Sequence, residues 1–399
     1  MKKLKIILFS LIVVNCCNSI AQFNDSLKID YFGQTPPGNI PVIFSPDLIS
    51  TPDVFVQNAS FSEDGKKFIY VITDSTWSKS TVMYRSYING KWSRPVPLNK
   101  PEEHWGTPYF SSDGKDIYFS SPIENNAGHI FVIHQTSNGW SKPVKLGFPI
   151  NTESIEPDLC LTPKGTMYFT SGRPGGFGDL DIYRSELENG RYIKAGNLGK
   201  FINTVACDEC PSIAPDESYL VFNSWKYNPK FKGNNLYVCF HDKNGNWSEP
   251  KDLGKGVNTD QLDIYPVITP DGKYIIFTRR QSSPVARFSN LYWVSTSILD
   301  SVRNSCGSIF IPIDIPSSEL SLYTGVYSNS EYTFKITIGE EKEHLSLAFF
   351  NFKGIILEAL EKNTFWGRGI KLKFDLNNGQ VQFISDWQNG NSLILTREK

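Results

Sequence analysis

The stretch "PYFSSDGKDIYFSS", residues 108–121, contains two short apolar runs joined by Asp113-Gly114. Asp-Gly tolerates the backbone of a tight hairpin turn, and the flanking Tyr, Phe and Ile residues favour strands. The stretch therefore predicts a β-hairpin.

The same hairpin template recurs four more times, at intervals of about fifty residues, which is a period typical of repeat folds. The other copies read "ASFSEDGKKFIYVIT" from Ala59, "LCLTPKGTMYFTS" from Leu159, "PSIAPDESYLVFNS" from Pro211 and "PVITPDGKYIIFTR" from Pro266. A third short strand follows each copy. Four copies then continue through Asn-Gly turns at Asn89, Asn138, Asn189 and Asn244. Four antiparallel strands per repeat predict an all-β fold with a five-bladed β-propeller.

The fifth repeat lacks the Asn-Gly turn and the fourth strand. The segment "IPVIFSPDLIST", Ile40 to Thr51, resembles the fourth strand and exit loop of the other repeats. An unpaired sheet edge needs a partner, so we expect this N-terminal strand to close the ring. A sixth, divergent blade is the alternative.

These repeats, and especially "SGRPGGFGDLDIY" from Ser171, resemble the WD-like, TolB-type propeller repeats of bacterial envelope proteins. The resemblance covers residues 33–298 and implies a scaffold whose partners vary between proteins.

The remaining chain shows alternating runs separated by polar turns, which predict a small antiparallel β-barrel-like domain. Its opening, "LYTGVYS" from Leu322, is similar to the lipocalin-like domains appended to penicillin-binding-type serine hydrolases. The serine-hydrolase motif Gly-x-Ser-x-Gly does not occur in the sequence. The predicted organisation is a signal peptide (1–21), an N-terminal segment (22–39), a propeller (40–298), a linker (299–318) and the small β domain (319–399).

The amino terminus has three lysines followed by a short apolar run and Ser19-Ile20-Ala21. This pattern predicts a secretory signal cut after Ala21, with lipoprotein acylation at Cys16 or Cys17 as the alternative. The apolar run is too short to span a bilayer, and no transmembrane segment is expected. The 40 basic and 41 acidic residues give a net charge of −1, which offers no electrostatic case for nucleic acid. The protein is therefore expected to be exported, and periplasmic, outer-membrane-associated or secreted.

Candidate ligand-binding residues come from two sets of loops that open on one face of a propeller. Loops entering the first strand carry carboxylates at one equivalent position, namely Glu156, Asp208 and Asp263. Loops between the second and third strands carry Arg173, Trp225, Arg279 and Arg280. Two interpretations are open: these groups pair with one another as part of the scaffold, or they form a polar ligand site at the channel mouth.

An enzyme is the alternative to a binding protein. Five-bladed glycosidases gather carboxylates at the ring centre, but catalysis needs carboxylates in unlike environments, and these three share one position. No catalytic residue, metal or cofactor is predicted, since the five histidines show no zinc spacing. A structural disulfide involving Cys160, Cys207, Cys210 or Cys239 is expected, with Cys306 as the odd thiol.

The sequence thus predicts an exported, non-catalytic binding or scaffold protein of the bacterial cell envelope. Its partner would be an envelope protein or a glycan or peptidoglycan fragment.

Overall fold

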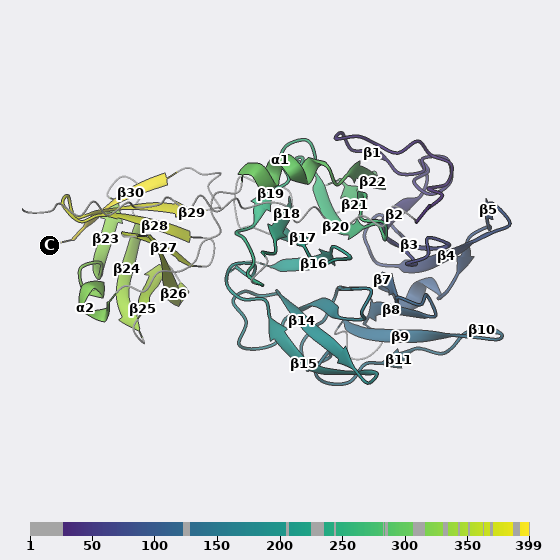
Figure 1. The fold of residues 1–399 in the computed structure, drawn as a ribbon, viewed down its shortest axis with the longest axis horizontal. Coiled ribbons are helices and arrows are strands. Elements are labelled where there is room, and N and C mark those ends of the chain that lie inside the picture. The colour runs from purple at the N-terminus through teal and green to yellow at the C-terminus, as the bar shows by residue number, and fades with distance from the viewer. Residues whose placement is uncertain are drawn as a thin grey trace, which may run out of the picture.

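The computed structural model describes residues 27–122, 128–204, 207–224, 235–242, 245–281, 283, 286–305, 316–329, 334–341, 344–349, 352–361, 363–367, 370–385 and 392–398. The predicted signal peptide, Trp225 and Cys306 lie outside these residues. The regular secondary structure of the described chain is mostly β strand, arranged as a propeller and a smaller barrel (Figure 1). No helix within the described ranges is long and apolar enough to cross a membrane.

Five antiparallel sheets form the blades. Blade 1 contains β2 (Phe55–Phe61), β3 (Lys67–Thr73), β4 (Ser80–Ile88), β5 (Lys91–Trp92) and β6 (Val96–Pro97). Blade 2 follows the 3-10 turn η1 (Pro101–Glu103) and contains β7 (Gly106–Phe110), β8 (Asp116–Ser121), β9 (His129–Thr136), β10 (Gly139–Trp140) and β11 (Val144–Lys145). Blade 3 contains β12 (Leu159–Leu161), β13 (Met167–Ser171), β14 (Asp181–Glu188) and β15 (Arg191–Asn197). Blade 4 contains β16 (Asp208–Ile213), β17 (Tyr219–Ser224), β18 (Asn235–Phe240) and β19 (Lys251–Asp252). Blade 5 contains β20 (Leu262–Ile268), β21 (Tyr274–Arg280), β22 (Ser289–Ser295) and β1 (Val42–Ile43).

The blades pack face to face through the alternation of side chains along each second strand. In β21, Ile275 and Phe277 pack into the apolar cluster shared with blade 4, whereas Ile276 packs into the cluster shared with blade 1. The same alternation builds the clusters at the other junctions. Successive residues of a strand point to opposite faces, so a continuous apolar run serves two interfaces. The ring of blades is therefore held by an apolar core at every junction.

The N-terminal strand closes the ring, as the incomplete fifth repeat predicted. Strand β1 pairs with β22, with Val42 opposite Trp293. The segment before β1 adds further contacts, because the Tyr31 hydroxyl donates to Asp271 (2.9 Å) and the Trp92 indole donates to the Asp30 carbonyl (3.0 Å). The five blades account for the four- and five-stranded sheets of the described chain, which contains no sixth blade.

The C-terminal part is an antiparallel barrel in which each strand pairs with the next and the last pairs with the first. It follows helices α1 (Ile298–Ser305) and α2 (Ser317–Leu320). Its strands are β23 (Gly325–Asn329), β24 (Phe334–Glu341), β25 (His344–Phe349), β26 (Phe352–Glu361), β27 (Thr364–Gly367), β28 (Ile370–Asp375), β29 (Gln380–Ser385) and β30 (Ser392–Arg397). Buried apolar side chains, including Tyr327, Leu347 and Phe383, pack into one core cluster in this domain.

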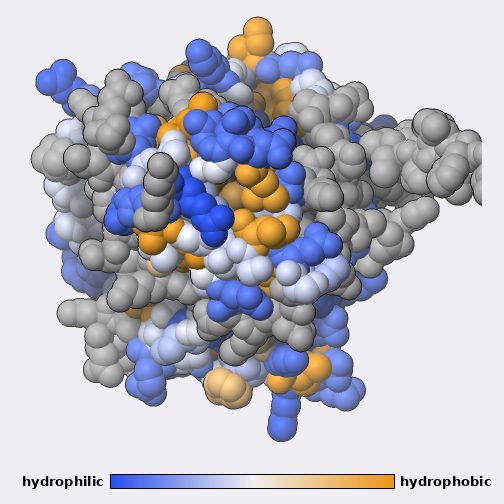
Figure 2. Space-filling model, turned by 90° about the vertical axis from the view of Figure 1, so that its left-hand side faces the viewer, coloured by the Kyte–Doolittle hydropathy of each residue, from blue (hydrophilic) through white to orange (hydrophobic). Residues whose placement is uncertain are grey.

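The outer surface of the molecule on the barrel side mixes apolar and hydrophilic residues (Figure 2). Among the described barrel residues, Leu322, Leu376 and Ile394 are large apolar side chains that are well exposed. Leu322 and Leu376 line a pocket of about 210 Å³ together with Asp375 and Arg397.

The expected disulfide among the propeller cysteines is wrong, because Cys160, Cys207, Cys210 and Cys239 are all free. Cys160 and Cys239 pack into the apolar cluster between blades 3 and 4. Cys207 and Cys210 lie at the start of β16, and residues three apart along an extended chain are separated by roughly 10 Å, too far for a disulfide. Packing, rather than cross-linking, explains the buried thiols.

Candidate functional site

The three predicted carboxylates occupy the same position in three neighbouring blades, and all are completely buried. Glu156, Asp208 and Asp263 each have 0% exposed surface. Each accepts a hydrogen bond from the hydroxyl of a threonine four residues earlier, namely Thr152 (2.7 Å), Thr204 (2.8 Å) and Thr259 (2.7 Å). The carboxylates therefore brace the loops that enter the first strands of their blades.

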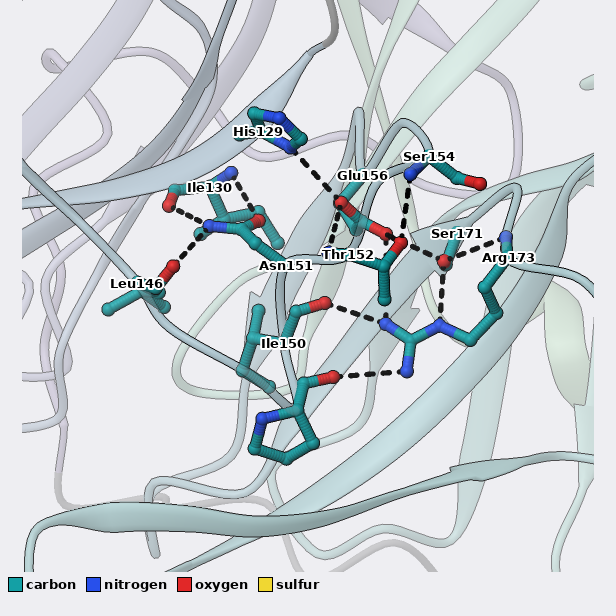
Figure 3. A network of polar contacts seen from close by, with 11 residues as sticks. His129, Ile130, Leu146, Ile150, Asn151, Thr152, Ser154, Glu156, Ser171 and Arg173 are labelled. Carbon is teal, nitrogen blue, oxygen red and sulfur yellow. Dashed lines mark hydrogen bonds and ion pairs between the residues drawn. The ribbon is translucent and has the colours of Figure 1, made fainter. Parts of the chain in front are cut away.

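An asparagine precedes each of these threonines and holds the third strand of the blade that the chain has just left. Asn151 Oδ1 accepts a hydrogen bond from the Ile130 amide (2.9 Å), and its amide group donates to the Ile130 carbonyl (2.8 Å). Asn203 and Asn258 make the equivalent contacts in the next two loops. We call this set of asparagine, threonine and carboxylate the Asn-Thr clamp. Figure 3 shows the copy between blades 2 and 3.

The predicted arginines Arg173 and Arg279 belong to these clamps. Arg173 Nη2 lies 3.7 Å from Glu156 Oε1 and donates to the Ile150 carbonyl, as Figure 3 shows. Arg279 Nε donates to Asp263 Oδ1 at 2.7 Å, and its Nη2 donates to the Val257 carbonyl. The sequence therefore identified side chains that do meet. Their partners, however, are each other and the backbone of their own loop.

Burial governs the ionisation of these pairs. Desolvation raises the pKa of Asp263, while Arg279 and Thr259 oppose that shift. Desolvation also lowers the pKa of Arg173, while Glu156 opposes it. His129 Nδ1 adds a further contact to Glu156 Oε2 at 3.3 Å. Charges so thoroughly surrounded by partners have little capacity left for a ligand.

Arg280 was predicted, together with Arg279, to be a ligand-binding residue at the channel mouth, but its side chain is buried between blades 5 and 1. Only 2% of its surface is exposed, its Nη2 donates to the Ser75 carbonyl, and its guanidinium lies over the Trp77 ring at 4.2 Å. Adjacent strand residues point to opposite faces, so Arg279 contacts its own blade and Arg280 reaches into blade 1. Trp225, the remaining predicted residue, lies outside the described chain.

A second set of equivalent residues lines the inner strands, and sequence analysis missed it. These residues stand four positions before the first residue of each turn between strands one and two: Asn58, Thr107, Asp158, Cys210 and Tyr265. All except Asp158 have a positive φ, from 41° to 54°. A bulge interrupts the strand pairing at each of these four. Bulges re-aim side chains, and they often lie beside functional sites.

Hydrogen bonds between blades fix three of these bulges. The amides of Asn58, Cys210 and Tyr265 donate to side chains of the preceding blades, namely Thr278 (3.0 Å), Thr170 (3.2 Å) and Asn223 (3.3 Å). The acceptors occupy equivalent positions on the second strands. The inner-strand side chains are therefore held in repeated positions around the axis.

Asp158, Cys210 and Tyr265 interact with one another, although they come from blades 3, 4 and 5. Burial raises the pKa of Asp158 to about 6, and the Cys210 thiol opposes this by hydrogen bonding to the carboxylate. Burial and Asp158 raise the pKa of Cys210, and Cys210 and Asp158 act on Tyr265 in turn. Blades 3 and 5 are not neighbours in the ring. Their side chains can interact closely only near the propeller axis, so we call these three residues the channel cluster.

Several buried polar atoms of blades 1 and 5 lack hydrogen-bond partners within the described chain. They are Asn58 Oδ1, Gln57 Oε1 and Arg280 Nη1. Asn58 and Gln57 are 8% and 9% exposed, and Arg280 interacts electrostatically with Tyr265. Buried polar atoms in native proteins are nearly always satisfied, so each of these calls for an explanation.

The two ends of the channel differ. At the end formed by the turns between strands one and two, a pocket of about 40 Å³ is lined by residues of all five blades. Its lining includes the buried apolar side chains of Phe61, Phe110, Leu161, Ile213 and Ile268. This turn end has room for a few water molecules. The opposite end, formed by the entering loops and the loops between strands two and three, we call the loop end.

No protein-family model matches the chain, and no curated protein matches it. Solved structures with a similar fold include TolB from Acinetobacter baumannii, at 18% identity and a TM-score of 0.37, covering 60% of this chain and 57% of that protein. A protein of Agrobacterium tumefaciens described as a TolB has 16% identity and a TM-score of 0.40, covering 63% and 80%. An α-L-arabinofuranosidase from Lactobacillus brevis has 11% identity and a TM-score of 0.43, covering 61% and 91%. The match thus spans little more than half of the A. baumannii protein. One fold serves proteins of different names, so the likeness selects no function.

Proposed function

We propose that this chain is an exported, non-catalytic β-propeller protein of the bacterial cell envelope that binds its partner at the loop end of the channel. The observation that carries the proposal is the set of buried polar atoms of Asn58, Gln57 and Arg280 that lack partners in the described chain. Asn58 stands at the position equivalent to Asp158, and Arg280 acts on Tyr265 of the channel cluster. These three groups are buried and short of hydrogen bonds. A partner that supplies hydrogen bonds would remove their desolvation cost, about 1–3 kcal/mol for each atom. We further propose that the barrel is a lipocalin-like accessory domain, and that the partner is an envelope protein or a glycan or peptidoglycan fragment.

The test compares capture of envelope components by the intact protein and two variants. Asp158→Leu removes the acid of the channel cluster. Asp113→Asn removes an exposed carboxylate at the turn end and serves as the matched control. We expect the component captured by the unmodified protein to be lost with Asp158→Leu and retained with Asp113→Asn. Equal capture by all three would place the partner elsewhere.

A glycan-active enzyme is the second candidate, and Asp158 favours it more than the predicted trio does. A carboxyl group whose pKa is raised to about 6 can act as a general acid near neutral pH, and Glu209 lies close to the same thiol. Hydrolysis of a polysaccharide panel by the unmodified protein, abolished by Asp158→Asn, would establish this function. A protein that releases no reducing sugar from any member of the panel would exclude it for those substrates.

A further inference from the structure

The barrel carries a pocket of its own, which is separate from the channel of the propeller. Four segments line it: the residues that follow α2, strand β23, the turn between β28 and β29, and the end of β30. Its volume of about 210 Å³ has room for a small molecule, since a water molecule takes up about 30 Å³. Tyr327 lines the pocket and also belongs to the buried core of the barrel. The pocket therefore lies against one end of the packed core, and we call it the barrel pocket.

Two opposite charges line the barrel pocket from strands that are not neighbours. Arg397 ends β30 and Asp375 ends β28, and β29 lies between these strands. Gln380 of β29 pairs with Asp375 on one side and with Thr396 on the other. Adjacent strands are about 4.8 Å apart, so the backbones of the two charged residues are separated by roughly 10 Å. No ion pair involves either of them within the described chain.

Arg397 is held in place but keeps donors for a ligand. Its Nη2 donates to the Thr324 carbonyl, and its backbone amide donates to the Gly379 carbonyl at 2.8 Å. Its Nε lies beside Gly325, where an added Cβ would come within 2.7 Å of it, so glycine is what lets the guanidinium lie there. A guanidinium carries several further N–H groups, and these form no hydrogen bond within the described chain. The Arg397 charge also opposes the rise in the pKa of Tyr327 that burial causes, so it acts within the pocket.

Asp375 is oriented by its own turn and keeps acceptor capacity. Its Oδ1 accepts hydrogen bonds from the amides of Asn377 (3.2 Å) and Asn378 (3.3 Å), and its Oδ2 accepts one from Asn378 Nδ2 (2.7 Å). The bond from the Asn378 side chain lowers the pKa of Asp375, and the two backbone amides add to this, so the carboxylate is ionised at neutral pH. A carboxylate has about four lone-pair sites, so Oδ2 can accept a further donor.

The remaining walls of the barrel pocket include two apolar side chains. Leu322 and Leu376 line it with 50% and 38% of their surfaces exposed. A ligand that covers these side chains would remove apolar surface from water, which favours binding. The pocket thus combines a cation, an anion and an apolar wall.

We propose that the barrel pocket binds a free amino acid with an aliphatic side chain. Arg397 holds the carboxylate of this ligand, Asp375 holds its ammonium group, and the two leucines cover its side chain. A simple anion would meet the Asp375 carboxylate and a simple cation would meet Arg397, whereas a zwitterion matches both charges. The barrel pocket and the loop end lie in different domains, so this inference does not depend on the proposed function.

The experiment is a ligand-observed NMR titration of the full chain at about pH 7, with L-leucine as the probe. Three truncated probes are compared with it: leucinamide lacks the carboxylate, isocaproate lacks the ammonium group, and glycine lacks the aliphatic side chain. We expect leucine to bind and each truncated probe to bind at least about tenfold more weakly. No leucine binding at concentrations on the order of 10 mM, or equal affinity for leucine and any truncated probe, would overturn the proposal.

Three variants locate the site. Arg397→Gln removes the cation, so it should weaken leucine binding at least about tenfold and abolish the preference for leucine over leucinamide. Leu322→Glu places a charge on an apolar wall and should also weaken binding at least about tenfold. Because Leu322 is half exposed, this variant tests the pocket even if Arg397→Gln fails to fold. Lys373→Gln is the matched control and should leave binding unchanged, since Lys373 is an exposed cation of β28 that does not line the pocket. Unchanged leucine affinity in Leu322→Glu, with the variant folded by circular dichroism, would overturn the site.

Discussion

Glu156 and Asp158 are two buried acids only two residues apart, yet they differ in almost every contact. Glu156 accepts hydrogen bonds from Thr152 and Ser171 and lies beside His129 and Arg173. Asp158 has a thiol and a threonine as its polar neighbours, and its pKa is raised to about 6. Burial by itself therefore does not identify a functional acid. What distinguishes the two is whether the fold supplies partners for the charge.

The largest expected change in unfolding free energy follows removal of a carboxylate of the Asn-Thr clamp. Asp263→Ala would leave Arg279 buried, with 14% of its side chain exposed, and without its carboxylate. Removing one partner of a buried ion pair typically costs about 3–5 kcal/mol of unfolding free energy. Urea denaturation of the variant measures this loss. The double variant Asp263→Ala, Arg279→Met should recover part of it, and a single variant as stable as the unmodified protein would show that the clamp is dispensable.

A smaller change in unfolding free energy, and of opposite sign, is expected when Asp158 of the channel cluster is replaced. The folded pKa of Asp158, about 6, exceeds the unfolded value of about 3.9, so its contribution to stability is full below pH 4 and is lost as the pH rises through 6. Asp158→Asn removes the ionisable group and should raise the unfolding free energy at pH 8 by on the order of 2–3 kcal/mol relative to pH 4. Urea denaturation at both pH values tests this. Destabilisation at pH 8 would make Asp158 a structural acid like Glu156.

The smallest effect is expected at an exposed charge on the loop side. Arg287 is exposed and lies in the loop that follows β21. Arg287→Glu should change the unfolding free energy by less than about 0.5 kcal/mol. Urea denaturation of the variant beside the unmodified protein measures this difference. A loss of more than about 1 kcal/mol would show that Arg287 has a structural role.

Much of the fold could be predicted because each blade is built from hairpins whose turns lie within a few residues of the strands that they join. The turn at Asp113-Gly114 and the hairpin turn at Asn89 impose their geometry within a few residues, and the missing fourth strand of the last repeat pointed to closure by Ile40 to Thr51. Part of the site could also be predicted, since Glu156 and Asp263 do meet Arg173 and Arg279.

The rest depended on contacts between distant segments. The clamp had a visible signal in "NTESIE", "NTVACD" and "NTDQLD", but its role required knowing which strand each asparagine holds. The burial of Arg280 depends on Ser75, which lies 205 positions away across the closure. The channel cluster escaped notice because its equivalent positions carry five different residue types, and a search for repeated acids passes over them.

Closure by an N-terminal strand also determines when during synthesis the propeller can complete its folding. The Leu291 amide meets the Ser50 hydroxyl across 241 positions, so the ring cannot close until nearly the whole propeller has been synthesised. At ribosomal rates of about 5–20 residues per second, β1 waits on the order of ten seconds to a minute for its partner. During that interval an unpaired strand is a hazard for aggregation. A closing strand of two residues, Val42–Ile43, preceded by Pro41, offers a poor template for another chain, so its brevity protects the nascent protein.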